Sequence, residues 1–315
     1  MWSFIARRLL ITVPTLVGVL TLAFLMIRLA PGDPAELLLG DYAGLSAQVL
    51  EDLRRRLGLD RPLYEQYVIY LTSVLTGDLG TSFRTSRPVL QEIRAMLPYT
   101  VMLMVSGIAF AVLIGVPTGV LAALKRDTWI DYLATTSAML WVSSPSFWFG
   151  ILLIYVFSFQ LRWFPVFGGG SLSDVGSLLH HLVLPTIAVG ARSAALITRM
   201  SRSAMLDVLS SDYVRTARAK GAGTARVIRH HALRNAAIPI MTVVGLDTAY
   251  LLSGTVIIES VFSRPGLGKL VVDSVYARDY SAVQGGIIVF AVFVLFVNLL
   301  TDIGYALVDP RVRYA

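Results

Sequence analysis

The sequence contains no cysteine and few charged residues. The absence of Cys among its 315 residues excludes disulfide bonds and thiolate metal sites. Charged residues make up 15% of the chain, whereas hydrophobic residues reach 56% and the mean hydropathy is +0.70. Soluble domains usually contain about 45 to 50% apolar residues. The composition therefore argues against a soluble globule and predicts a membrane protein.

Six apolar stretches are each about 20 residues long, which is enough for a helix to cross a hydrocarbon core of about 30 Å. A helix is favoured because it satisfies its own backbone hydrogen bonds in lipid. The predicted spans are residues 9–29, 100–123, 139–159, 179–200, 237–258 and 284–307. The predicted fold class is all-α, a polytopic membrane protein with six transmembrane helices.

Basic residues cluster in four short segments that these spans place on one side of the membrane. The segments contain Arg7 with Arg8, Lys125 with Arg126, eight Lys or Arg from Arg199 to Arg234, and Arg311 with Arg313. The positive-inside rule makes this side cytoplasmic and predicts that both termini are cytoplasmic. The predicted parts are an N-terminus with the first span (1–30), an extracytoplasmic helical insertion (31–97) and a core with five spans (98–315), which includes a cytoplasmic loop (201–236).

The extracytoplasmic insertion carries two helical patterns. In the first, apolar residues from Val49 to Leu57 share one face between Ser46 as N-cap and Gly58 as stop. In the second, an apolar stripe from Leu63 to Val74 follows Asp60 and Pro62. Such a layer either packs over the ends of the spans or receives a partner.

The densest positive charge lies in "DYVRTARAKGAGTARVIRHHALRNA", residues 212–236, with six Lys or Arg and one Asp. Ser211 or Asp212 is placed to cap a short helix in which Ala217 and Gly221 lie four residues apart. Charge alone leaves three interpretations open: holding the loop inside, binding anionic lipid headgroups, or binding nucleic acid. Nucleic acid is disfavoured because no aromatic platform accompanies the charges.

This loop resembles the cytoplasmic signature loop of ABC-importer permeases of the dipeptide, oligopeptide and nickel family. Further pieces resemble the same family along most of the chain, most closely the first permease subunit of dipeptide systems: "RRLL", "LAPGDP", "GDLGTSFRTSRPV", "ESVFSRPGLGKL" and "DPRVR". Two features depart from the general permease motif. Arg215, Thr216 and Ala217 replace Glu-Ala-Ala, and the closing proline is delayed to Pro239; both departures are usual in the peptide subfamily.

The resemblance implies a non-catalytic permease subunit of the bacterial inner membrane that imports di- or oligopeptides. Nickel chelates, glutathione or another small solute are the alternative cargo. The implied partners are a second, homologous permease in a heterodimer, two ABC ATPase subunits that use ATP and Mg, an extracytoplasmic substrate-binding protein, and membrane lipid. This chain would bind no cofactor and no nucleic acid. The residues implied to couple it to an ATPase are Ala217, Arg218, Lys220 and Gly221.

Rival functions make different predictions. A stand-alone channel or membrane-bound enzyme would work without ATPase partners, and a lipid-binding scaffold would depend on loop charge but not on Ala217 or Gly221. The stretch "SRPGLGK" does not meet the phosphate-loop pattern, since Ser263 replaces its first Gly and Leu270 follows Lys269. The adjacent histidine pairs at 180–181 and 230–231 point about 100° apart on a helix, which disfavours chelation of one metal ion.

Five ionisable residues lie in or near the predicted spans: Arg28, Arg192, Asp247, Glu259 and Asp302. Each would cost about 2.5 to 3.5 kcal/mol at a helix centre facing lipid, so each is expected to face protein, water or headgroups. Arg28 and Glu259 lie near span exits, where they snorkel or pair. Arg192, Asp247 and Asp302 are the candidates for a translocation path, which would suit a zwitterionic peptide; the alternative is that they form ion pairs between helices.

Overall fold

The computed structural model describes residues 2–29, 48, 51, 54–55 and 60–308. The described residues are mainly helical, which confirms the all-α class, and one isolated bridge joins Thr81 to Pro88. The chain forms two compact units. The first comprises Met1–Ile5, Tyr99–Pro265 and Phe296–Ala315, and the second comprises Ala6–Pro98 and Gly266–Leu295.

Four helices of the described part are long and apolar enough to cross a membrane: α5 (Val89–Leu124), α8 (Val175–Leu209), α11 (Leu233–Val261) and α13 (Tyr280–Val308). A bent pair of helices makes a fifth candidate. The remaining predicted span lies in α1 (Trp2–Leu29), whose apolar stretch Leu10–Met26 is shorter. The six predicted spans thus correspond to four long helices, one broken pair and the shorter stretch of α1.

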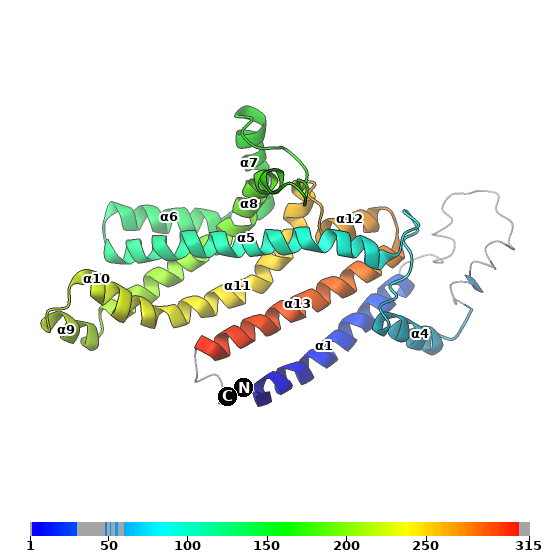
Figure 1. Cartoon of the computed structure of the whole chain (residues 1–315), viewed down its shortest axis with the longest axis horizontal. Helices are drawn as coiled ribbons and strands as arrows, with labels where there is room; N and C mark the ends of the chain where they lie inside the picture. Colours follow the sequence, from blue (N-terminus) through cyan, green and yellow to red (C-terminus); the bar gives the residue numbers. More distant parts are fainter. Residues whose placement is uncertain (1, 30–47, 49–50, 52–53, 56–59, 309–315) are drawn as a thin grey trace. The chain divides into compact units, whose positions relative to one another are not determined.

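The predicted span at residues 139–159 is wrong as a single helix. Helix α6 (Trp129–Ser143) ends there, and α7 (Ser146–Leu153) starts at an angle of 106° and continues as the π-helix η1 (Ile154–Gln160). Pro145 causes the break, because its ring disfavours helical geometry at Ser144, where ψ is 131°, and because it has no N–H to donate. Figure 1 shows α7 pointing away from the direction of α6.

Glycines bring α5 and α8 into close contact within the first unit, where the two helices cross (Figure 1). A Cβ atom built on Gly115 of α5 would lie 2.7 Å from the carbonyl oxygen of Ala194 on α8. A Cβ on Gly119 would overlap the carbonyl oxygen of Thr198. Membrane helices pack through such small residues, because lipid provides no hydrophobic drive for helix association.

An ion pair that the sequence analysis did not identify holds α6 to α8. Arg202 donates from Nε and Nη2 to the two carboxylate oxygens of Asp131, at 2.5 and 2.7 Å. Asp131 also accepts from the backbone N–H of Asp127 at 3.0 Å. The Asp131 side chain is 3% exposed, so this two-pronged pair satisfies a nearly buried carboxylate.

The second unit contains the predicted helix after Pro62, which the structure confirms as α4 (Leu63–Leu75). The other predicted helix of the insertion lies almost entirely outside the described residues. The buried carboxylate of Asp279 accepts from Ser82 Oγ at 2.6 Å and from the backbone N–H of Ala282 at 3.1 Å. It thereby ties the loop before α5 to the start of α13, beside α12 (Leu267–Tyr276).

Replacing Gly115 by Ala should destabilise the protein, although Ala is the better helix former by about 1 kcal/mol. The added methyl group enters space that α8 already fills, and overpacking costs about 1 to 3 kcal/mol. Gly18→Ala on α1 is the matched control, because nothing lies within 4 Å of a Cβ at Gly18. The midpoint of thermal unfolding of the purified protein should fall for Gly115→Ala and stay or rise for Gly18→Ala. Equal unfolding midpoints for the two variants would contradict the close packing of α5 against α8 at Gly115.

Candidate functional site

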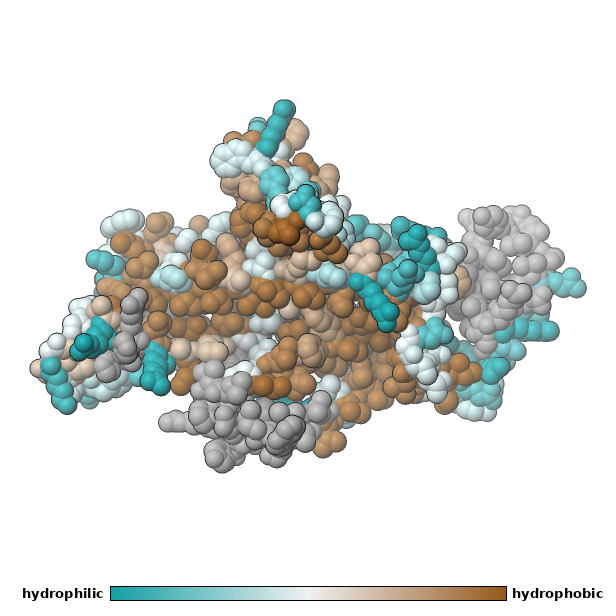
Figure 2. All heavy atoms as spheres, in the orientation of Figure 1, coloured by the Kyte–Doolittle hydropathy of each residue, from teal (hydrophilic) through white to brown (hydrophobic). Residues whose placement is uncertain are grey.

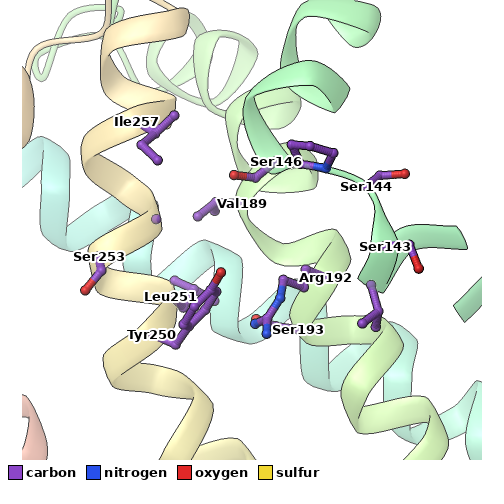
Figure 3. Close-up of a pocket in the computed structure, with 13 residues that line it drawn as sticks. Ser143, Ser144, Ser146, Val189, Arg192, Ser193, Tyr250, Leu251, Ser253 and Ile257 are labelled. Atoms are coloured by element: carbon purple, nitrogen blue, oxygen red, sulfur yellow. The ribbon is translucent and has the colours of Figure 1, made fainter. Parts of the chain in front are cut away.

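A pocket of about 330 Å³ lies in the first unit, between α8, α11 and the break that separates α6 from α7 (Figure 3). Its wall is rich in hydroxyl groups and contains one charged side chain, Arg192. The residues that line it are Val142, Ser143, Ser144, Pro145, Ser146, Val189, Arg192, Ser193, Tyr250, Leu251, Ser253, Gly254 and Ile257. Arg192 and the hydroxyl groups make this pocket the candidate translocation site.

Arg192 lines the pocket and contacts Asp247 behind it, and both residues were expected in a translocation path. Arg192 of α8 donates from Nη1 to the Oδ1 atom of Asp247 on α11 at 3.4 Å. Its guanidinium group also lies over the ring of Tyr250, 3.8 Å from the ring centre. The Asp247 side chain is 6% exposed, whereas that of Arg192 is 30% exposed. The cation therefore faces the pocket while the carboxylate lies behind it.

The break between α6 and α7 indicates that this pocket contains water. Non-helical backbone at membrane depth is tolerated only where it is buried in protein or lines a water-filled cavity. Ser144 and Pro145 supply that backbone and also line the pocket. The first N–H groups of α7 have no partner inside their own helix, so they need water, protein or cargo at this point.

The basic loop forms a second candidate site, at the end of α8. It contains α9 (Asp212–Ala219), the short α10 (Thr224–Arg226) and the π-helix η2 (Val227–Ala232), which leads into α11. Val214 of α9 is fully buried, and Asn235 of α11 donates to Tyr213 Oη at 2.8 Å. Helix α9 is thereby anchored on its inner side. Figure 2 shows hydrophilic residues gathered around α9 and α10, in contrast to the apolar lengths of α5 and α11.

Gly221 has a conformational role that its small size alone did not predict. It follows the end of α9 with φ +82°, a conformation that favours glycine. Its N–H donates to the Arg218 carbonyl at 2.9 Å, and the N–H of Ala222 donates to the Ala217 carbonyl at 3.1 Å. These two bonds form a Schellman cap. Ala217 lies one turn after the buried Val214 and is half-buried.

Among the four predicted coupling residues, Arg218, Lys220 and Gly221 are exposed. The structure thus places basic side chains on the free surface next to the cap. Their role in ATPase coupling stays a prediction.

The other predicted charges lie outside the pocket. Asp302 is half-buried on α13 and does not line it. Arg28 donates from Nη2 to Gln66 at 2.8 Å, and the fully buried Glu259 accepts from Thr100 Oγ1 at 2.6 Å. Both are therefore paired in the interior of their own units. The pocket therefore gives no support to Asp302 as a residue of the translocation path.

The histidine rings next to each other at 180 and 181 contact backbone oxygens. His180 Nε2 lies 2.8 Å from the carbonyl of Trp163, and His181 Nδ1 lies 2.8 Å from that of Ser177. No group of three or more His, Asp or Glu in the described part of the chain is arranged to hold a metal ion. The side chains of His230 and His231 lie outside the described residues.

Arg264 is a buried cation that the sequence analysis missed. It is fully buried, and its Nη1 contacts the carbonyl oxygens of Gly169 and His181 at 3.4 and 3.5 Å. Burial lowers the pKa of its guanidinium group, opposed by the charge of Glu259. Arg264 lies just beyond α11, where a charged residue in a loop gave no signal of burial in the sequence.

Comparison with known families accounts for nearly the whole chain. Residues 115–314 match the family described as binding-protein-dependent transport system inner membrane component. Residues 1–104 match the N-terminal region of the membrane components of such systems.

Individual relatives match over their full length. The chain is 44% identical to the di/tripeptide transport system permease protein DppB of Pseudomonas aeruginosa, covering 100% of this chain and 99% of the relative. It is 41% identical to the dipeptide transport system permease protein DppB of Alkalihalophilus pseudofirmus and 43% identical to the glutathione transport system permease protein GsiC of Escherichia coli, with 100% of both chains covered in each case. An inward-facing structure of the MetNI methionine ABC transporter matches with a TM-score of 0.56 at 19% identity, over 70% of this chain and 97% of that one, which shows a shared fold.

The water-filled character of the pocket can be tested by introducing cysteine, since the chain has none of its own. A thiol reacts with charged methanethiosulfonate reagents as the thiolate, which needs water around it. Ser253→Cys, which lines the pocket, should be labelled within minutes in intact membranes. Leu113→Cys, on an exposed apolar face of α5, is the control and should stay unlabelled. If Leu113→Cys were labelled and Ser253→Cys were not, an aqueous pocket at α11 would be excluded.

Proposed function

This chain belongs to the inner-membrane components of binding-protein-dependent transport systems, and from that premise we propose that it forms part of the path by which an ABC importer takes up small peptides. The observation that carries the proposal is α9, a short basic helix whose Arg218 is exposed, whose Val214 is fully buried and whose Tyr213 accepts a hydrogen bond from Asn235. Such a helix presents a fixed surface to a cytosolic partner.

The coupling mechanism follows from where α9 is attached. Helix α8 ends at Leu209 and α9 begins at Asp212, while η2 leads directly into α11. The two helices that carry Arg192 and Asp247 therefore flank the loop. An ATPase that binds Arg218 and Lys220 in one nucleotide state more tightly than in another would bias the arrangement of α8 and α11, because a ligand shifts an equilibrium by its difference in affinity.

The proposed assembly contains this permease, a second homologous permease, two ABC ATPases and an extracytoplasmic binding protein. Both termini and the 201–236 loop lie in the cytoplasm, as the basic residues predict. ATP and Mg are used by the ATPases, and this chain is a non-catalytic subunit that binds neither. The insertion at residues 31–97 lies on the side from which the binding protein delivers cargo.

Di- and tripeptides are the proposed cargo, since two relatives at 41% and 44% identity carry those names. Glutathione is the second candidate, because a relative at 43% identity over full length is named for it. Both candidates have an ammonium group and carboxylate groups, which fits a pocket that presents a cation and hydroxyl groups. Nickel chelates lack support from these relatives.

The proposal predicts that charge reversal at Arg218 will uncouple transport. In liposomes that hold the complete complex, Arg218→Glu should reduce ATP-dependent uptake of a labelled dipeptide about tenfold or more and should weaken recovery of the ATPases in a pull-down. A tenfold loss corresponds to about 1.4 kcal/mol, which a repulsive charge at a docking surface is enough to cost.

Arg226→Glu is the matched control, because Arg226 is exposed in the same loop but lies outside α9. It should keep uptake and ATPase recovery near the level of the unmodified chain. Equal losses in both variants would mean that loop charge serves topology or lipid binding. Uptake without ATP would support a channel, and uptake of glutathione but not of the dipeptide would select the second cargo.

A further inference from the structure

The guanidinium group of Arg192 has unused hydrogen-bonding capacity in the pocket. An arginine has five N–H donors, and the one contact to Asp247 is long, at 3.4 Å from Nη1. Among the described residues, neither Nε nor Nη2 of Arg192 has a hydrogen-bond partner. The group lies over the Tyr250 ring, which occupies its flat face and leaves its N–H edge available.

Several serines and a helix start line the same pocket as this cation (Figure 3). Within the part of the chain that the structure describes, the side chains of Ser143, Ser146 and Ser193 make no hydrogen bond, although all three line the pocket. Ser144 and Pro145 precede α7, whose first N–H groups carry a partial positive charge. In transporters, the starts of broken helices near the membrane midplane often point at anionic groups of the cargo.

We propose that this pocket binds the C-terminal carboxylate of the transported peptide, with the N–H edge of Arg192 bonded to both carboxylate oxygens and pocket serines bonded to the peptide amides. This inference rests on the proposed transport of peptides. A carboxylate fits because its two oxygens match the planar fork of arginine. The volume of about 330 Å³ lies at the small end of the usual range for ligand pockets, which suits a dipeptide.

Asp247 then acts as the resident counterion of Arg192. It keeps the cation paired when no cargo is bound, and its single long contact leaves the guanidinium free to take a better carboxylate. Removing its charge should therefore strengthen cargo binding, whereas removing the charge of Arg192 should abolish the preference for a carboxylate.

The test compares dialanine with dialanine amide, which differ only at the C-terminal carboxylate. Dissociation constants are measured by saturation-transfer NMR on the complete transporter in lipid nanodiscs, without the binding protein, so that only the membrane site is probed. The unmodified complex should bind dialanine about ten- to a hundredfold more tightly than the amide, as expected for hydrogen bonds to a charged group. Arg192→Gln should remove this preference, Arg192→Lys should keep part of it, and Asp247→Asn should increase it.

Arg199→Gln is the matched control, since Arg199 lies on α8 two turns further along and does not line the pocket. It should leave the preference unchanged. A preference that survives in both Arg192 variants, or is absent from the unmodified complex, overturns the carboxylate site.

ATP-dependent uptake of dialanine by the same preparations, with the binding protein added, separates the two levels of the proposal. If the unmodified complex takes up dialanine but shows no carboxylate preference at the membrane site, the inference fails and the transport function stands. If it takes up no peptide at all, the proposed function itself fails.

Discussion

One constraint governs this protein: a backbone N–H or C=O group that faces hydrocarbon must have a partner. Along most of their lengths the long helices α5, α8, α11 and α13 meet it with their own backbone hydrogen bonds, except where a proline such as Pro185 or Pro239 has no N–H to donate. The break at Ser144 and Pro145 does not, because two helix ends leave unpaired groups there and Pro145 has no N–H. The chain resolves this by placing the break against the pocket. The pocket is therefore a consequence of the short sequence Ser-Ser-Pro-Ser as much as of the charges that face it.

The same pocket is mechanically connected to the basic loop. Leu209 follows Arg192 by seventeen residue positions along an unbroken α8, a distance of about 26 Å. Gly115 and Gly119 allow α5 to pack closely against α8. Asp131 of α6 is bonded to Arg202 of α8. Close packing of this kind favours movement as a body over gradual deformation. A displacement of α9 would therefore reach the pocket through α8, and through α11 on its other side.

The sequence predicted the helical class and most spans, because long apolar runs outweigh local irregularities. It failed at residues 139–159, since hydropathy averages over a window whereas Pro145 acts on one peptide bond. Pro145 within an apolar run was the available signal, but Pro185 and Pro239 also lie in apolar runs and their helices continue through them. It also missed the pairing of Asp131 with Arg202, because a contact between residues 71 apart depends on how α6 and α8 cross. The meeting of Arg192 with Asp247 was among the alternatives, yet only the packing of α8 on α11 brings the two together.

Two Arg–Asp pairs in this chain differ in a way that bears on function. Arg202 uses two donors at 2.5 and 2.7 Å on Asp131, which bonds both oxygens of the carboxylate. Arg192 makes one contact at 3.4 Å to a nearly buried Asp247, and such a contact does not repay the cost of desolvating a carboxylate. Replacing such a pair by apolar residues of similar volume is often neutral or stabilising. Stability therefore accounts for the first pair but not for the second, and the under-used guanidinium of Arg192 is the charge that has bonding capacity left for cargo.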